Sequence, residues 1–175
     1  MTTSTQIDTE RTDILEMLAK HRHFLRYTVR DLTDEQAGLR TTASELCLGG
    51  LIKHVAAVEA NWAGFIIDGP AKAPDFDSMT EEQIAQWSEI FRMLPGDTLE
   101  GVLAEYEQVA ARTDELVRTL PDLNVSQPLP EAPWFEPGGR WTARRTLMHI
   151  MTETAQHSGH ADIIRESLDG AKSMG

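Results

Sequence analysis

Three side chains of the types that bind divalent metal ions stand out in this sequence. Glu153 and His157 lie four residues apart in the segment Glu153-Thr-Ala-Gln-His157-Ser-Gly-His160, and His54 stands in an apolar segment about a hundred residues earlier. Residues four apart lie on one face of a helix. Imidazole nitrogens and carboxylate oxygens hold catalytic metals that keep one position open, unlike the closed thiolate cage of a structural site. We therefore predict a metal held by His54, Glu153 and His157.

The case for a metal depends on which face of the last helix is buried. Burying a carboxylate among imidazoles is costly unless a partner compensates for it, and a cation compensates for all of them at once. Two alternatives stay open: core histidines that are satisfied by hydrogen bonds, and a surface Glu–His ion pair. The face expected to point into the core carries Thr146, Ile150, Glu153, His157, His160, Ile164 and Leu168.

Other polar residues near this segment are given supporting roles. His160, one turn beyond His157, is predicted to be catalytic through a water, a substrate or a contact with a ligand. His149 is interpreted as a core residue or as a group that orients a ligand from outside the triad, and Glu59 as another such outer partner. Arg144 and Arg145 are predicted to bind an anionic co-substrate, with solvated surface arginines as the alternative.

Composition limits the classes of protein to which the chain can belong. The 175 residues suffice for one well-buried core, so we predict a single domain over residues 1–175. A formal net charge of -12 repels nucleic acid and anionic lipid, and no apolar run is long enough to span a bilayer. The single Cys47 excludes an internal disulfide, and the N-terminus lacks the pattern of a secretory signal. A cytoplasmic protein acting on a small molecule is expected.

Apolar side chains recur at helical spacing in four long segments, and no comparable segment alternates like a strand. Thr98 and Thr142 are predicted N-caps, Gly170 is a predicted stop, and Thr80 is predicted to open a further short helix. The sequence therefore predicts an all-α fold. The expected long helices cover approximately residues 8–31, 48–67, 99–120 and 142–169.

The segment before the last helix has a different character. Residues 121–140 hold five of the eight prolines together with Gly138 and Gly139, which predicts a long irregular loop. Long loops inside compact domains are often functional. With Trp134 and Phe135, this loop could cover a pocket as a lid, or it could be an ordinary crossover between helices.

Together these segments resemble the DinB/YfiT-like metalloenzymes over nearly the whole chain. The resemblance is carried by Leu48-Gly-Gly-Leu-Ile-Lys-His54-Val-Ala-Ala-Val-Glu59-Ala-Asn-Trp62, by Trp141-Thr-Ala-Arg-Arg, and by the segment from His149 to Asp162. It implies an up-down-down-up four-helix bundle that often dimerises, with a metal held by three residues, usually histidines. His54 and His157 match two of those positions, and Glu153 replaces the third histidine.

The His/Glu/His set resembles mycothiol-dependent maleylpyruvate isomerase and its relatives, in which such a set binds zinc. This branch implies a thiol-dependent S-transferase or isomerase that uses mycothiol or a similar low-molecular-weight thiol on a small electrophile. The residue types alone also fit Ni, Fe or Mn, and they fit a metal-dependent hydrolase. A bundle that binds metal without catalysis, for example in a stress response, is a further alternative.

Overall fold

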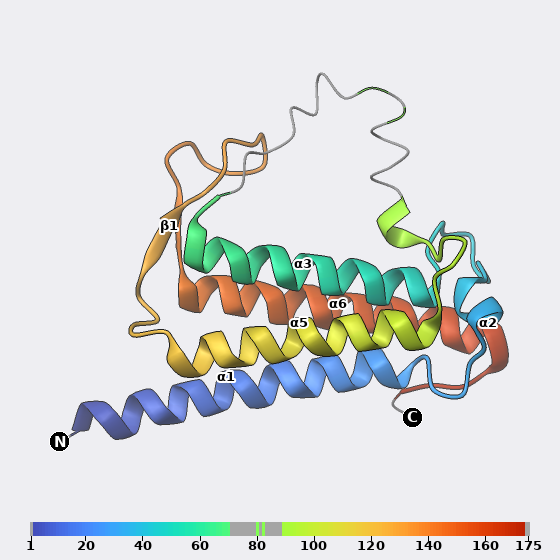
Figure 1. Cartoon of the computed structure of the whole chain (residues 1–175), viewed down its shortest axis with the longest axis horizontal. Helices are drawn as coiled ribbons and strands as arrows, with labels where there is room; N and C mark the ends of the chain where they lie inside the picture. Colours follow the sequence, from blue (N-terminus) through green and yellow to red (C-terminus); the bar gives the residue numbers. More distant parts are fainter. Residues whose placement is uncertain (1, 71–79, 81, 83–88, 174–175) are drawn as a thin grey trace.

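A computed structural model shows four long helices that lie side by side (Figure 1). It describes residues 2–70, 80, 82 and 89–173. The helix α3 packs extensively against α5 and α6, and α1 packs mainly against α6. The colours of Figure 1 show that α1 and α6 run in one direction and that α3 and α5 run in the other. The long helices are α1 (Thr2–Tyr27), α3 (Leu48–Asp68), α5 (Leu99–Thr119) and α6 (Ala143–Asp169).

The prediction of an all-α fold is confirmed, and three of the four long helices begin and end close to the expected residues. Thr98 and Thr142 cap α5 and α6 by accepting hydrogen bonds from the amides of Gly101 and Arg145. Gly170 ends α6 in the left-handed conformation, with φ 79°, which a glycine adopts at little cost. Among the described residues, two short helices lie in the connections: α2 (Asp34–Gly38) and η2 (Glu89–Phe91). The short helix expected after Thr80 lies largely outside the described residues.

The first helix differs from its prediction at both ends, since it begins at Thr2 and ends at Tyr27 instead of near Asp31. The guanidinium of Arg165 on α6 donates hydrogen bonds to the carbonyls of Thr28 and Arg30, at 2.8 Å each. The chain then turns at Asp31, whose φ is 59°. A contact from a distant helix therefore fixes this turn, and apolar periodicity could not reveal it.

The prediction that residues 121–140 lack regular structure is wrong in part. Strands β1 (Ser126–Pro128) and β2 (Arg140–Thr142) pair antiparallel, with Gln127 opposite Trp141. A proline is tolerated there because a two-stranded ribbon has only edge strands. The amides of Ala143 and Arg144 donate to the carbonyls of Val125 and Leu123, so this segment satisfies the first free amides of α6.

Polar groups as well as apolar ones hold the long helices together. Glu59 of α3 is fully buried, and Arg22 of α1 donates to both of its carboxylate oxygens, at 3.1 and 2.5 Å. Arg22 also donates to Asp114 of α5 at 2.7 Å, so one guanidinium joins three helices.

None of the described helices is long and apolar enough to cross a membrane.

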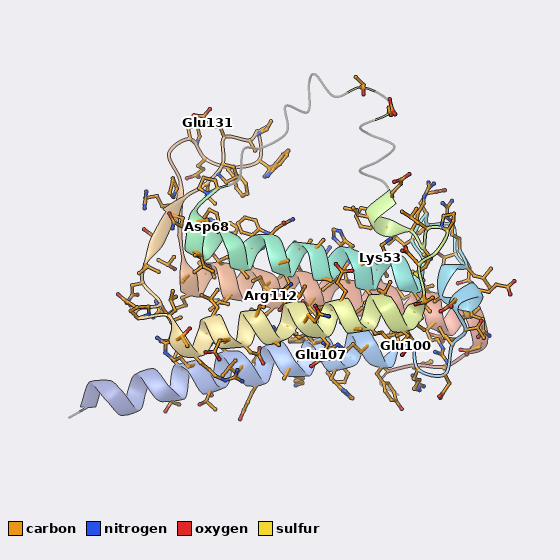
Figure 2. All side chains as sticks on the ribbon, viewed as in Figure 1. Lys53, Asp68, Glu100, Glu107, Arg112 and Glu131 are labelled. Carbon is orange, nitrogen blue, oxygen red and sulfur yellow. The ribbon has the colours of Figure 1, made fainter. Side chains whose placement is uncertain are left out.

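Removing the carboxylate of Glu59 should strongly destabilise the fold, because it leaves the Arg22 charge buried with one partner fewer. We expect Glu59→Ala to lower the free energy of unfolding by about 3–5 kcal/mol in urea denaturation. Glu107, which pairs with Arg26 and lies on the outer face of α5 (Figure 2), provides the control. Glu107→Ala should cost less than about 1 kcal/mol. Equal losses in the two variants would contradict this account.

Candidate metal centre

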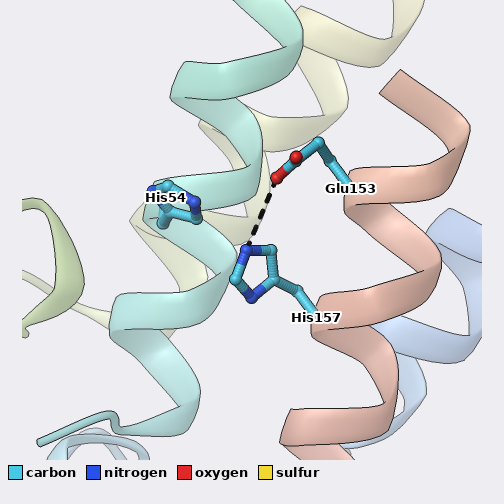
Figure 3. A group of neighbouring side chains, drawn as sticks. All are labelled: His54, Glu153 and His157. Atoms are coloured by element: carbon cyan, nitrogen blue, oxygen red, sulfur yellow. Dashed lines mark ion pairs between the residues drawn. The ribbon is translucent and has the colours of Figure 1, made fainter. Parts of the chain in front are cut away.

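The three predicted ligands lie together between α3 and α6 (Figure 3). His54 comes from α3, and Glu153 and His157 come from successive turns of α6. One potential ligand atom from each residue lies within 4.8 Å of the other two. The rings of His54 and His157 meet edge to face, with 4.7 Å between their centroids. The structure thus brings together the residues that the sequence singled out.

The prediction that Glu153 and His157 lie on the core-facing side of α6 is wrong in part. Both residues lie beside the most buried face of this helix. That face carries Ile150, Thr154, Ser158 and Ala161, whereas Glu153 and His157 are half-buried. Thr154 and Ser158 donate to the carbonyls one turn back, at 2.9 and 2.7 Å, so the buried hydroxyls need no ion. The argument for a metal therefore depends on the triad itself and not on a buried polar stripe.

The triad has the features expected of residues that share an ion. His157 Nε2 lies 3.7 Å from a carboxylate oxygen of Glu153, too far for a hydrogen bond. Two ligands held about 2.1 Å from a tetrahedral ion are roughly 3.4 Å apart, so small side-chain adjustments would suffice. Nδ1 of His54 is buried and has no hydrogen-bond partner among the described residues. Such a group costs about 1–3 kcal/mol when unsatisfied.

Burial keeps the imidazoles of the site in the neutral form that binds metals. Burial, with a smaller effect from nearby His157, lowers the pKa of His54 to about 4. Burial also lowers the pKa of His157, although Glu153 opposes this shift. Protons therefore compete weakly with a metal at neutral pH.

His160 contacts a predicted ligand from behind. Its Nδ1 lies 3.4 Å from Nδ1 of His157, while Nε2 of His157 is the nitrogen nearer to Glu153. One of the two facing nitrogens must carry the proton and the other must accept it. This contact can fix the ring of His157 with Nε2 toward the triad, so the geometry favours a positioning role for His160 over a reacting one.

An aromatic cluster adjoins the triad through His149. The ring of His149 meets those of Trp62 and Trp141, with centroid distances of 4.8 and 5.1 Å, and its Nε2 lies 3.8 Å from Glu153. Phe135 from the loop between the strands packs edge-on against Trp141 at 5.7 Å. Phe135 of the predicted loop thus contacts the aromatic cluster beside the triad.

The sequence of the whole chain was compared with known protein families. The mycothiol-S-transferase family matches residues 13–170, a range that includes His54, Glu153 and His157. The chain belongs to the mycothiol S-transferase family. This confirms the resemblance to DinB-like proteins at the level of the family. A comparison with curated proteins finds no match.

Glu59 and Arg144, which the sequence also singled out, make their polar contacts away from the triad. Both carboxylate oxygens of Glu59 accept hydrogen bonds from Arg22, so the structure gives Glu59 a core ion pair instead of a role beside the triad. Arg144 bonds to Glu10 of α1 and, at 2.6 Å, to Asn124, so its guanidinium holds the start of α6. Neither role was visible in local spacing, because both partners lie on distant segments.

Arg145 has a different environment from Arg144. Its guanidinium lies over the ring of Trp141, 4.7 Å from the ring centroid, and it has no ion-pair partner among the described residues. Its role as a co-substrate contact stays a prediction.

Sequence reasoning missed the residue that covers His54. Phe91 of η2 stacks on the imidazole with 4.2 Å between ring centroids. Lys53 donates to the carbonyl of Arg92 at 3.0 Å, which helps to hold this segment against α3. Gly50 permits the contact, because a Cβ there would overlap the backbone of Phe91. The sequence feature that could have indicated this contact is the pair Gly49 and Gly50 in the first turn of the helix. Glycine is unfavourable inside helices, so it usually marks a place where another segment packs closely.

The lowered pKa of His54 predicts how pH affects the stability of the metal-free protein. An unfolded histidine gains its proton near pH 6.5, whereas folded His54 gains it near pH 4. The contribution of neutral His54 to the free energy of unfolding is therefore complete above pH 6.5 and is lost as the pH falls from 6.5 toward 4. We expect the free energy of unfolding, measured by urea denaturation, to fall less between pH 7 and pH 5 in His54→Asn than in wild type, because asparagine cannot be protonated. Equal declines in both proteins would contradict the shift.

Adding a methyl group at Gly50 should displace Phe91 from His54. We expect Gly50→Ala to lower the free energy of unfolding by about 1–3 kcal/mol, because backbone atoms of Phe91 leave no space for a Cβ. Gly64 on the same helix has no atom within 4 Å of a Cβ and is the matched control. Gly64→Ala should stabilise the helix by about 0.5–1 kcal/mol. A neutral Gly50→Ala would show that this packing is unimportant.

Proposed function

We propose that the chain is a divalent-metal-dependent enzyme that joins mycothiol, or a similar low-molecular-weight thiol, to a small electrophile. Support comes from membership in the mycothiol S-transferase family together with the convergence of His54, Glu153 and His157. The observation that carries the metal is the convergence of His54, Glu153 and His157, each of which offers one potential ligand atom within 4.8 Å of the other two. We also propose that residues 1–175 form one up-down-down-up bundle domain.

In this proposal His54, Glu153 and His157 hold the ion, and zinc is the preferred metal because two imidazoles and one carboxylate suit its open catalytic sites. A bound divalent cation supplies a thiolate at neutral pH, whereas a free thiol has a pKa of about 8.5. His160 would hold the ring of His157 in orientation, as a positioning residue. Phe91 would exclude water from one side of His54. The homodimer and the cytoplasmic location stay predictions.

The thiol would lose its proton to solvent, and its sulfur would attack the electrophilic carbon to form a carbon–sulfur bond. In a transferase the bond from that carbon to the leaving group breaks, and the leaving group takes up a proton. In an isomerase the new carbon–sulfur bond breaks again, which releases the rearranged product and regenerates the thiol. The transferase and isomerase reactions share this first bond, so the same site serves both. The half-buried position of the triad favours this chemistry, because a nucleophile with little solvent around it reacts more readily. The hydrolase and the non-catalytic bundle are outcomes that the following experiment separates.

Elemental analysis of the untagged protein should find about one divalent metal ion per chain. His54→Ala and His157→Ala should lose this metal and lower the rate of mycothiol conjugation at least 100-fold, because two ligands rarely retain a catalytic ion. His160→Asn should retain the metal with about tenfold weaker affinity. His23→Ala, an exposed change on α1, is the control and should behave as wild type.

Assays with mycothiol, bacillithiol and glutathione against a panel of electrophiles test the reaction itself. Metal at one per chain without conjugation or isomerisation would favour the non-catalytic bundle. Hydrolysis without any thiol would favour a hydrolase. Wild-type protein without bound metal after reconstitution with zinc would refute the metal centre.

A further inference from the structure

The solvent-facing side of α6 forms a continuous stripe that carries charges only at its two ends. Arg145 stands at one end and Glu166 at the other, and both are exposed. Consecutive exposed positions lie three or four residues apart, so they share one face of the helix, opposite the buried face. We call these positions the outer stripe of α6. Between its charged ends the stripe consists of Met148, Thr152, Gln156, Gly159 and Ile163.

The outer stripe is unusually apolar for a helix face in contact with water. Met148 and Ile163 leave 56% and 63% of their surfaces exposed. The exposed face of α5, in contrast, carries charges such as Glu100, Glu107 and Arg112 (Figure 2). Single exposed apolar side chains are ordinary, but two on one uncharged stripe indicate a surface that another surface can cover.

The order of residues along the stripe is complementary to the same order read backwards. Consider two copies of α6 that pack antiparallel about a two-fold axis passing between positions 155 and 156. Each residue of the stripe then faces the residue that lies equally far beyond the axis in the other copy. The facing pairs are Arg145 with Glu166, Met148 with Ile163, and Thr152 with Gly159.

The charged ends favour this antiparallel arrangement. Arg145 lies over the ring of Trp141 and has no ion-pair partner among the described residues. Glu166 pairs with Lys172 at 3.0 Å, yet its side chain stays 54% exposed and can accept a second donor. Two copies would form the Arg145–Glu166 pair twice, once at each end of the contact. A parallel arrangement would instead bring like charges together.

The middle of the stripe allows two helices to approach closely. Gly159 has no side chain, and small residues at a contact shorten the distance between packed helices. The hydroxyl of Thr152 donates to the carbonyl of Met148 at 2.9 Å, so covering this residue leaves its donor satisfied. Each chain carries a formal net charge of -12, so two copies approach at least cost through an uncharged face.

We propose that the outer stripe of α6 binds the same stripe of a second copy of this chain, antiparallel about a two-fold axis. The contact does not depend on the metal or on the thiol chemistry proposed above, since Glu153 and His157 are not part of the stripe. The stripe extends over about 32 Å of helix, whereas standard interfaces involve about 20–30 residues a side. A weak dimer follows, with a Kd of about 10–100 µM.

Sedimentation equilibrium of the full chain as purified, from about 1 µM to 1 mM, tests this contact. Wild type should form a reversible dimer. Arg145→Glu should weaken association at least about tenfold, because it places two acidic side chains together at each end. Adding Glu166→Arg to Arg145→Glu restores opposite charges and should return the Kd to within about threefold of wild type.

Arg112→Glu makes the same charge change on α5 and is the matched control, with a Kd expected within about twofold of wild type. Gly159→Arg tests the middle of the stripe, where a Cβ would meet no atom of its own chain within 4 Å. This variant should be monomeric, because it places a charge in the contact, and should keep the circular dichroism of wild type.

Three results would overturn the proposal. Wild type could stay monomeric at about 1 mM, which would leave the stripe to a different partner. A wild-type dimer could survive both Arg145→Glu and Gly159→Arg, which would place the contact on another face. The double charge exchange could associate no better than Arg145→Glu alone, which would exclude the antiparallel register.

Discussion

The half-buried contact between α3 and α6 is the constraint on which the candidate site depends. It removes enough water from His54 and His157 to lower both pKa values, yet it leaves the triad at the edge of the core. A fully buried triad would have no room for a co-substrate, and a fully exposed one would hold its histidines partly protonated near pH 6.5. The same packing brings a residue from each helix within reach of one ion.

Stability and chemistry are divided between neighbouring turns of the same helices. On α3, Glu59 turns into the core to bind Arg22, while His54 lies at the margin beneath Phe91. On α6, Thr154 and Ser158 face the core and satisfy their hydroxyls locally, while Glu153 and His157 lie beside them. The buried groups of Glu59, Thr154 and Ser158 are thus paired within the protein, whereas Nδ1 of His54, a residue of the triad, has no hydrogen-bond partner among the described residues.

Local sequence rules were enough for three of the four long helices and for the choice of three residues that converge in the structure. N-cap hydroxyls at Thr98 and Thr142 and the four-residue spacing of Glu153 and His157 are properties of neighbouring residues, and they appear in the structure as expected. The Arg22–Glu59 pair, the turn held by Arg165 and the cover of Phe91 depend on partners far apart in the chain. We predicted that the buried face of α6 passes through Glu153 and His157, whereas it passes through Thr154 and Ser158. An apolar stripe on a helix is about 100° wide, so the sequence pattern does not fix the centre of the stripe to within one residue.

The pairing of β1 and β2 next to α6 has a consequence for how this protein can vary. Carbonyls of Leu123 and Val125 hold the first amides of α6, and Arg165 holds its other end to the turn after α1. Helix α6, which carries two of the three predicted ligands, is thus held at both ends by contacts that do not involve residues 129–139. Changes of length or composition in that hairpin can therefore be accommodated while His54, Glu153 and His157 keep their arrangement.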